Sequence, residues 1–338
     1  MKCFRLRCLR FSCQTVILRL THISSSNIFG KLVDLKMRNF VCEVEQLNRP
    51  YVHIKDKDAV NKKISNLIDG GMNKLQLVSD FDKTITKQHE NGKRHRSSFN
   101  MFYDCPSITA EYIDAAKALD KKYAPSEVDP TIPRDEKIKL MIEWWTLSEK
   151  TLKGLVVPPE EIENICAIIG PSMRDGTKEF FEFLEANQVP ILVFSAGLGD
   201  TVVAVLKHCE VYLSNVEVVS NFLKYDSEGR IEGFKDILIH VYNKNEVAIK
   251  DTDFYHKIAD RENVILMGDS LGDASMVGGL DNINEVLKIG FLYERIDEAL
   301  PDYLDTFDIV LVDDQTMDVP RAILALINSK DNIPGDSV

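Results

Sequence analysis

Residues 75–84 have the sequence LQLVSDFDKT, in which a short alternating stretch with Leu75, Leu77 and Val78 leads to Asp80 and Asp82. Two short apolar runs, over residues 189–194 and 263–267, are followed in the same way by Ser195 and Asp269. Short apolar runs bounded by polar residues are typical of strands that are buried on both faces. Because amphipathic helical patterns lie between these runs, the sequence predicts an α/β fold with a parallel sheet covered by helices.

Residues 87–165 interrupt this alternation of strands and helices. Amphipathic helices are expected over residues 110–123, 134–153 and 159–169. Since this segment lies between the first strand and the next core strand, the sequence predicts a helical cap domain inserted into an α/β core. The expected division is an N-terminal extension at 1–40, a core formed by 41–86 and 166–330, the cap at 87–165 and a C-terminal tail at 331–338.

The composition argues against some kinds of partner. With 53 acidic and 41 basic residues, the chain has a formal net charge of −12, so no nucleic acid or anionic membrane surface is expected as the main partner. No stretch after the N-terminal extension is long and apolar enough to span a bilayer. The seven cysteines are scattered, without a CxxC pair or a zinc spacing, which favours reduced cysteines of an intracellular protein.

The N-terminal extension has a composition of its own. It contains several basic residues within its first 33 positions and no acid before Asp34. This pattern resembles a mitochondrial transit peptide. The alternative is a disordered, dispensable extension, with Met37 as another start of translation. The second interpretation predicts a cytoplasmic location and the first a mitochondrial one.

Asp80 and Asp82 have the spacing of a nucleophile and a general acid–base. A carboxylate can attack phosphorus and form an aspartyl-phosphate, which divides one difficult displacement into two easier ones. Asp82 lies on the same side of an extended chain, where it could protonate the leaving oxygen and then deprotonate the attacking water. The alternative is that Asp80 only caps a turn, as acids after a strand commonly do.

Ser195 and Lys244 are candidates for binding a phosphoryl group. The Ser195 hydroxyl and the amides of Ala196 and Gly197 could donate hydrogen bonds to phosphoryl oxygens beside a helix N-terminus. The Lys244 ammonium could neutralise charge on the phosphoryl group and on the nucleophile. The alternatives are a helix N-cap for Ser195 and an ordinary surface lysine for Lys244.

Asp269 and Asp273, in the sequence GDSLGD at residues 268–273, have the spacing of a magnesium site. Mg²⁺ prefers hard oxygen ligands, and it keeps several waters besides one or two protein carboxylates. The alternative is a glycine-rich turn into a helix that Asp273 caps. Two acids four positions apart after a fully apolar strand favour the metal site, so Mg²⁺ is the expected cofactor.

These motifs together resemble those of haloacid dehalogenase-type phosphohydrolases, which implies a Rossmann-like parallel sheet of that type. A closer resemblance, from about residue 51 to residue 326, is to the cytosolic 5'-nucleotidase III family. The segments that carry it are KLQLVSDFD at 74–82, FSAGLGD at 194–200, VSNF at 219–222, GFK at 233–235, LIHVYNK at 238–244, GDSLGD at 268–273 and LKIGF at 287–291.

This resemblance implies roles for the acidic residues of the motifs. Asp80 would be the nucleophile and Asp82 the acid–base. Mg²⁺ would be bound by Asp80, by the main-chain carbonyl of Asp82 and by Asp269. Asp273 would support the metal site.

The resemblance also implies contacts with the substrate. Phosphate would be bound by Ser195, Ala196 and Lys244. In the expected cap, Glu127 matches the glutamate that recognises the base in the family, and Ser148 matches a second substrate contact. Without the family, Glu127 would be interpreted as a solvated acid at a helix end.

Trp145 bears on the choice of base. Its position is tyrosine in the pyrimidine-preferring branch of the family and tryptophan in the branch that acts on 7-methyl-GMP. An indole face is the best aromatic partner for a delocalised cation such as 7-methylguanine. The alternative is that Trp144 and Trp145 only pack against the core. Since Glu127 could accept hydrogen bonds from guanine or from cytosine, both 7-methyl-GMP and CMP or UMP stay open.

The sequence therefore predicts a monomeric, magnesium-dependent 5'-nucleotidase that hydrolyses nucleoside 5'-monophosphates. One rival is a related phosphatase for another small phosphate monoester, such as phosphoserine or a sugar phosphate. A second rival is a non-catalytic nucleotide-binding protein on a retained phosphatase fold. Glu127 and Trp145 argue against the first rival, and the presence of every catalytic acid argues against the second.

Overall fold

The computed structural model describes residues 39–129, 131–169, 173–245, 253–280 and 282–331. The expected N-terminal extension and C-terminal tail lie outside these residues, apart from Asn39, Phe40 and Asp331. The Asn39 side chain caps helix α1 (Phe40–Glu43), and Phe40 is buried. Phe40 therefore packs with the core, one residue before the expected boundary.

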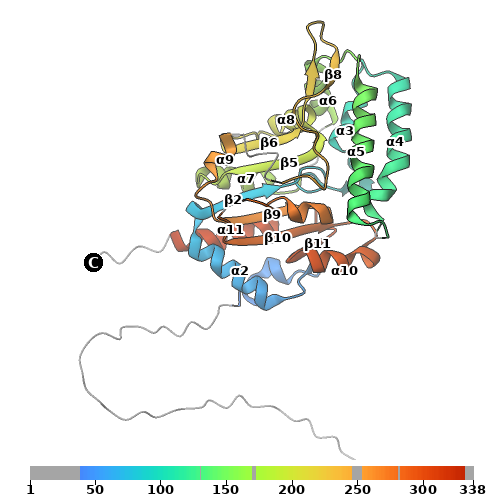
Figure 1. Ribbon diagram of the computed structural model, residues 1–338. Helices are drawn as coiled ribbons and strands as arrows, with labels where there is room; N and C mark the ends of the chain where they lie inside the picture. The colour runs from blue at the N-terminus through green and yellow to red at the C-terminus, as the bar shows by residue number, and fades with distance from the viewer. Residues whose placement is uncertain (1–38, 130, 170–172, 246–252, 281, 332–338) are drawn as a thin grey trace, which may run out of the picture. The chain divides into compact units, whose positions relative to one another are not determined.

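A seven-stranded sheet lies at the centre of the described chain, with the strand order β1-β11-β10-β9-β2-β5-β6 (Figure 1). Its neighbouring strands are parallel, except that β1 is antiparallel to β11. The predicted α/β fold with a mostly parallel sheet is confirmed. In sheet order, the strands are β1 (Val52–His53), β11 (Ile309–Val312), β10 (Glu285–Leu292), β9 (Asn263–Gly268), β2 (Leu75–Ser79), β5 (Ile191–Leu198) and β6 (Val216–Asn221).

Helices cover both faces of this sheet. Leu77 packs on one face with helices α2, α7, α8 and α11, and its neighbour Val78 packs on the other face with α9 and α10. Because successive residues of a strand point to opposite faces, a strand covered on both sides needs a continuous apolar run. The helices are α2 (Lys57–Gly70), α7 (Thr177–Ala186), α8 (Gly199–His208), α9 (Asp253–Lys257), α10 (Ile296–Thr306) and α11 (Asp318–Asp331).

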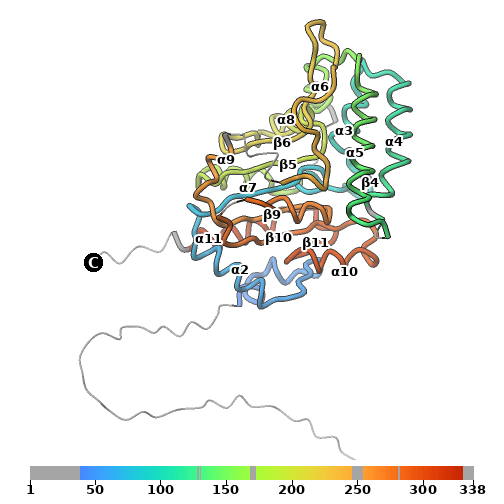
Figure 2. The backbone as a smooth tube through the Cα atoms, in the orientation of Figure 1, coloured from blue at the N-terminus to red at the C-terminus, as the bar shows by residue number. Residues whose placement is uncertain are grey.

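Residues 87–165, called the inserted segment below, contain a short hairpin followed by helices. Helices α4 and α5 pack against each other, as the backbone trace shows, and α3 and α6 pack against α8 (Figure 2). None of the described helices has both the length and the apolar character needed to cross a membrane. The elements are β3 (His89–Glu90), β4 (Lys93–Arg94), α3 (Ser98–Phe102), α4 (Ala110–Val128), α5 (Arg134–Leu152) and α6 (Pro159–Ile169), the last of which extends beyond the segment.

Helix α4 is longer than the sequence pattern predicts. It passes the expected end at residue 123 and continues through Pro125 to Val128. A proline removes one backbone donor and distorts the turn before it, but near a helix end few bonds are lost. As a result, Glu127 lies in the last turn of a helix that stands over the sheet's strand ends.

A second hairpin, formed by β7 (Leu223–Tyr225) and β8 (Ile231–Phe234), was not predicted. Strand β8 contacts α5, and the backbone amide of Phe234 donates to Glu149 Oε1 of α5 at 3.1 Å. The hairpin therefore links the inserted segment to the chain that follows β6. The remaining elements are the 3₁₀ helices η1 (Glu45–Asn48), η2 (Met72–Lys74) and η4 (Leu271–Ser275).

Candidate active site

Three candidate residues meet at the carboxyl edge of the sheet, because β9, β2 and β5 are neighbouring parallel strands. Asp80 directly follows β2, and its amide donates to the carbonyl of Met267 in β9 at 3.0 Å. Asp269 directly follows β9. Ser195 lies in β5, where the pairing with β6 shifts register. Ligands of parallel α/β sheets bind at this edge, so the position is that of a binding site.

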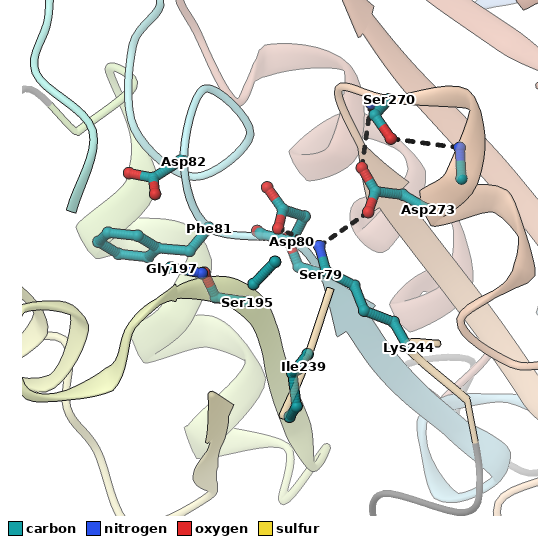
Figure 3. Close-up of polar contacts among 12 residues, drawn as sticks. Ser79, Asp80, Phe81, Asp82, Ser195, Gly197, Ile239, Lys244, Ser270 and Asp273 are labelled. Atoms are coloured by element: carbon teal, nitrogen blue, oxygen red, sulfur yellow. Dashed lines mark hydrogen bonds and ion pairs between the residues drawn. The ribbon is translucent and has the colours of Figure 1, made fainter. Parts of the chain in front are cut away.

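Asp80, Lys244 and Asp273 form a buried ion triad (Figure 3). The Lys244 Nζ lies 2.5 Å from Asp80 Oδ1 and 2.8 Å from Asp273 Oδ1. Burial raises the pKa of Asp80 to about 7, against the opposing effect of Lys244. Burial by itself lowers the pKa of Lys244, but the charges of Asp273 and Asp80 outweigh it and the pKa is raised. Lys244 is therefore a buried cation at the strand ends and not the surface lysine of the alternative.

Asp82 is held by the start of helix α3. The backbone amide of Ser98 donates to Asp82 Oδ1 at 2.8 Å, and the Ser98 hydroxyl donates to Asp82 Oδ2 at 2.6 Å. Burial raises the pKa of Asp82, and these two hydrogen bonds oppose the rise. A Cβ atom at Gly197 would overlap the Ser98 hydroxyl, so the close approach of β5 to Asp82 requires glycine there. No local pattern in the sequence indicates this role of Ser98.

Ser195, Ala196 and Gly197 form the turn at the end of β5. The Ser195 side chain is buried, and its hydroxyl accepts from the Gly197 amide at 3.0 Å. Helix α8 begins at Gly199 with Leu198 as its N-cap residue, so Ser195 does not cap this helix. Ser195 and Asp80 lie at the ends of the neighbouring parallel strands β5 and β2, and both are labelled in Figure 3.

An acidic cluster formed by Asp80, Asp269 and Asp273 fits a divalent cation. Each can offer a carboxylate oxygen, and these oxygens lie within 4.8 Å of one another. Burial raises the pKa of Asp269 well above its usual range, and the neighbouring Asp80 and Asp273 add to the rise while Lys83 opposes it. Crowded, buried carboxylates with hard oxygen donors are the setting in which a divalent cation binds favourably.

Asp273 has a second set of contacts that favours a supporting role. Its Oδ2 accepts from the amide of Ser270 at 3.0 Å, while Oδ1 binds Lys244. Ser270 and Asp273 thereby form a capping box at the start of η4. Asp273 therefore caps the turn into η4, as the alternative interpretation expected, and it also binds the buried Lys244.

Asn221, at the end of β6, joins two parts of the site. Its Nδ2 donates to the carbonyls of Ala196 at 2.9 Å and Ile239 at 2.8 Å, and its Oδ1 accepts from the Ile239 amide at 2.8 Å. The side chain is fully buried. Asn221 thus holds the turn at Ser195 and the loop that leads to Lys244 in one arrangement. In the sequence, only the VSNF segment at 219–222, part of the family resemblance, singles out Asn221.

The Arg174 guanidinium supports the loop after Asp82 by hydrogen bonds to main-chain carbonyls. Its Nε donates to the Thr84 carbonyl at 2.6 Å and its Nη2 to the Lys83 carbonyl at 2.5 Å, while Nη1 donates to the carbonyl of Asp314. Burial lowers the pKa of Arg174 to about 9, so the group stays a cation at neutral pH. Lys83 has a left-handed φ of 62°, and the hydrogen bonds of the arginine to the Lys83 and Thr84 carbonyls stabilise this strained turn.

Glu127 faces the acidic cluster from the inserted segment. Burial raises the pKa of its carboxyl, the charges of Lys83 and Lys244 lower it, and Asp273 raises it. These charges reach Glu127 because the end of α4 stands over the strand ends, although part of the side chain still meets solvent. Its main-chain carbonyl accepts from the hydroxyl of Tyr242 at 3.0 Å. Glu127 is therefore a site-facing residue and not a solvated acid.

Trp145 and Ser148 lie on α5. The Trp145 ring is 5.0 Å from the ring of Phe99 in α3 and 6.0 Å from that of Trp144, and it is half-buried. Trp145 therefore packs against neighbouring aromatic rings, as the alternative interpretation of the two tryptophans expected. Ser148 is half-buried, and its carbonyl accepts from the Thr151 hydroxyl.

The chain is similar to known 5'-nucleotidases in sequence and in structure. The pyrimidine 5'-nucleotidase (UMPH-1) family matches residues 83–328. A 7-methylguanosine phosphate-specific 5'-nucleotidase from Drosophila melanogaster is 42% identical over 290 residues, which cover 85% of this chain and 91% of the relative. The human protein of the same name is 36% identical, over 83% of this chain and 94% of its own. The solved structure of cytosolic 5'-nucleotidase IIIB bound to cytidine superposes with a TM-score of 0.83 at 42% identity, over 86% of this chain and 98% of that one.

The fold is that of an α/β 5'-nucleotidase, since the solved structure of cytosolic 5'-nucleotidase IIIB superposes over nearly its whole length. Within that class, the chain belongs to the pyrimidine 5'-nucleotidase (UMPH-1) family. The sequence resemblance to the cytosolic 5'-nucleotidase III family is thereby confirmed.

Proposed function

We propose that this 5'-nucleotidase hydrolyses nucleoside 5'-monophosphates through an aspartyl-phosphate on Asp80, with Mg²⁺ as cofactor. The observation that carries the proposal is the position of the Asp80 carboxylate, which is buried beside Lys244 and close to the carboxylates of Asp269 and Asp273. A nucleophile beside a fixed cation and a metal site is the arrangement that phosphoryl transfer needs.

In the first step, an Asp80 oxygen attacks the phosphorus and the bond from phosphorus to the nucleoside 5' oxygen breaks. Asp82 in its protonated form gives its proton to that leaving oxygen. In the second step, Asp82 takes a proton from water, which attacks the same phosphorus and releases inorganic phosphate from Asp80. The rise in the pKa of Asp82 caused by burial favours its protonated form before the first step.

The phosphoryl oxygens would be held by donors from separate elements. Lys244 supplies a charge, and Ser195 and the Ala196 amide supply hydrogen bonds at the end of β5. Asn221 keeps these two elements together, since it binds Ala196 and the loop before Lys244. The donors are therefore fixed before the substrate arrives, which is the condition for stabilising a transition state.

Mg²⁺ would be bound by Asp80, the main-chain carbonyl of Asp82 and Asp269. Asp273 would support the site through Lys244 and Ser270. When bound, the metal ion would neutralise the clustered carboxylates and stabilise negative charge on the phosphoryl group.

The inserted segment would act as a cap that recognises the base. Glu127 would accept hydrogen bonds from the base, Ser148 would provide a second contact, and Trp145 would stack on it. The indole face of Trp145 suits a cationic base such as 7-methylguanine. The names of the relatives include 7-methylguanosine phosphate, and cytosolic 5'-nucleotidase IIIB was solved with cytidine, so 7-methyl-GMP, CMP and UMP are the substrates proposed.

The cellular setting follows the same relatives. We propose a cytoplasmic location, since the matching solved structure is named a cytosolic enzyme. The proposed oligomeric state is a monomer. The alternative of a mitochondrial enzyme depends on residues 1–38, which lie outside the described chain. Neither nucleic acid nor a membrane is proposed as a partner, given the net charge of −12.

A substrate panel tests the proposal. Purified enzyme with Mg²⁺ is assayed for phosphate release from 7-methyl-GMP, CMP, UMP, GMP, AMP, phosphoserine and ribose 5-phosphate, with EDTA-treated enzyme as the blank. Turnover of 7-methyl-GMP or CMP well above the last two compounds is expected. Preference for phosphoserine or ribose 5-phosphate would favour a phosphatase with another substrate, and no turnover of any compound would favour a non-catalytic binding protein.

A further inference from the structure

We infer that Tyr242 is a positioning residue that sets the distance between the base-recognising and phosphate-binding ends of the site. Its hydroxyl donates to the main-chain carbonyl of Glu127 at 3.0 Å. The contact crosses from the loop that holds Lys244 to the end of α4 in the inserted segment. The inference rests on the proposed function, because it assumes that Glu127 contacts the base and Lys244 the phosphate.

The loop that contains Tyr242 is held firmly relative to Lys244. The Asn243 side chain accepts from the His240 amide at 2.7 Å and donates to the Leu238 carbonyl at 2.8 Å. The Tyr242 amide donates to His240 Nδ1 at 3.2 Å, and Asn221 holds the loop at Ile239. Tyr242 and Lys244 are therefore two positions on one internally bonded loop, so the Tyr242 hydroxyl has a defined place with respect to the buried ammonium.

The acceptor of this hydrogen bond lies at the end of a helix. The last carbonyls of an α-helix have no partner within the helix and need donors from elsewhere. The Glu127 carbonyl receives two: the Tyr242 hydroxyl and the Nζ of Lys137 in α5, at 2.8 Å. The Lys137 contact lies wholly within the inserted segment, whereas the Tyr242 contact joins that segment to the rest of the chain. The two donors therefore have separable effects.

The Tyr242 hydroxyl is protonated throughout the neutral range. Burial raises the pKa of Tyr242 to about 12, and the negative charge of Glu127 adds to the rise. The phenol is thus a permanent donor, and the contact does not depend on pH near neutrality. The contact fixes the position of the Glu127 backbone, and it thereby positions the Glu127 carboxylate relative to the site.

The test is Tyr242→Phe, which removes one oxygen atom and keeps the ring. KM and kcat are measured for CMP and 7-methyl-GMP, and inorganic phosphate is used as a competitive inhibitor that probes the phosphate end alone. We expect KM for the nucleotides to rise about five-fold, the equivalent of one net hydrogen bond. The inhibition constant of inorganic phosphate is expected to stay within about two-fold.

Three further variants separate positioning from folding. Tyr212→Phe, which alters an exposed ring, is expected to leave KM and kcat unchanged. Lys137→Met removes the donor within the inserted segment, and it is expected to affect KM less than Tyr242→Phe does. In a Glu127→Gln background, the effect of Tyr242→Phe on KM for the nucleotides should disappear, as a double-mutant cycle would show.

Two results would overturn the inference alone: an equal change for nucleotides and inorganic phosphate in Tyr242→Phe, or no change in either. The first would show that Tyr242 only supports the Lys244 loop, and the second that the contact has no effect in solution. If the wild-type enzyme releases no phosphate from any nucleotide, the proposed function fails and the inference fails with it. Thermal unfolding of each variant checks that folding is intact.

Discussion

The Nζ of Lys244 lies 2.5 Å from Oδ1 of Asp80, and the two side chains are only 3% and 7% exposed. Such a buried ion pair contributes little to net stability, because the cost of desolvation offsets much of the attraction. On the proposed function, this pair at the end of β2, next to two further aspartates, would serve chemistry. The charge of Lys244 would hold the nucleophile ionised and then balance the charge of the phosphoryl group.

Lys244→Met tests this role of the buried cation. Because the substitution removes the fixed charge next to the transferred group, we expect kcat to fall about 10²- to 10³-fold. Phosphate release from CMP or 7-methyl-GMP measures the effect. Lys224→Met, at an exposed ion pair with Glu232, is the matched control and should leave kcat unchanged. A Lys244→Met enzyme with near wild-type kcat would contradict the role.

Ser98→Ala tests the protonation of Asp82. The Ser98 hydroxyl favours the charged form of Asp82, so its loss should raise the pKa of Asp82 further. Since the first step requires protonated Asp82, the fall of kcat/KM on the alkaline side should move to higher pH. Ser97→Ala, which removes only the cap of α3, should leave the pH of this alkaline fall in kcat/KM unchanged. A shift to lower pH in Ser98→Ala would show that Asp82 acts otherwise.

Asn221→Ala should affect both stability and catalysis. Three buried hydrogen bonds are lost, at about 1 kcal/mol each, so the free energy of unfolding should fall by about 3 kcal/mol. Because both phosphate-binding elements lose a shared support, kcat should fall as well. Urea unfolding and phosphate release measure the two effects, with Asn187→Ala as a remote single-bond control. A loss of stability with unchanged kcat would limit Asn221 to folding.

Metal binding should be visible without turnover. A cation that binds only the folded chain stabilises it by RT ln(1 + L/Kd), where L is the free cation concentration, so its Tm rises with the logarithm of L once L exceeds Kd. We expect Mg²⁺ to raise the Tm of the wild-type protein and to have no effect on Asp269→Asn, measured by calorimetry. Asp269→Asn without metal should itself be at least as stable as metal-free wild type, because one of three crowded carboxylates loses its charge. An equal rise in Tm with Mg²⁺ in both proteins would show that the metal ion binds elsewhere.

The parts of the site that lie on strand ends could be predicted from the sequence. Largely apolar stretches that lead to Asp80 and Asp269 specify buried parallel strands, and the carboxyl ends of such strands meet at one edge. Lys244 is harder to predict, because it follows no regular element. Only its position in the LIHVYNK segment of the family resemblance distinguishes it from other lysines. Glu127 was found through the family resemblance alone, since nothing local shows that α4 extends over the sheet.

The supporting residues could not be predicted. Ser98, Arg174, Asn221 and Tyr242 act by binding main-chain atoms or a carboxylate far away in the sequence, and such contacts leave no periodic pattern. The β7–β8 hairpin was missed for a related reason, since its short strands pair mainly with each other and contact α5. These features depend on tertiary structure, which local propensity does not report.

The most direct test of the account is phosphate release by Asp80→Asn compared with wild type, on the nucleotide that wild type hydrolyses fastest. Removal of the nucleophile leaves no atom to form the aspartyl-phosphate, so the rate should fall at least about 10³-fold. Unfolding curves of the two proteins confirm that both are folded. An Asp80→Asn enzyme that retained turnover within about ten-fold of wild type would contradict the central claim that Asp80 is the nucleophile.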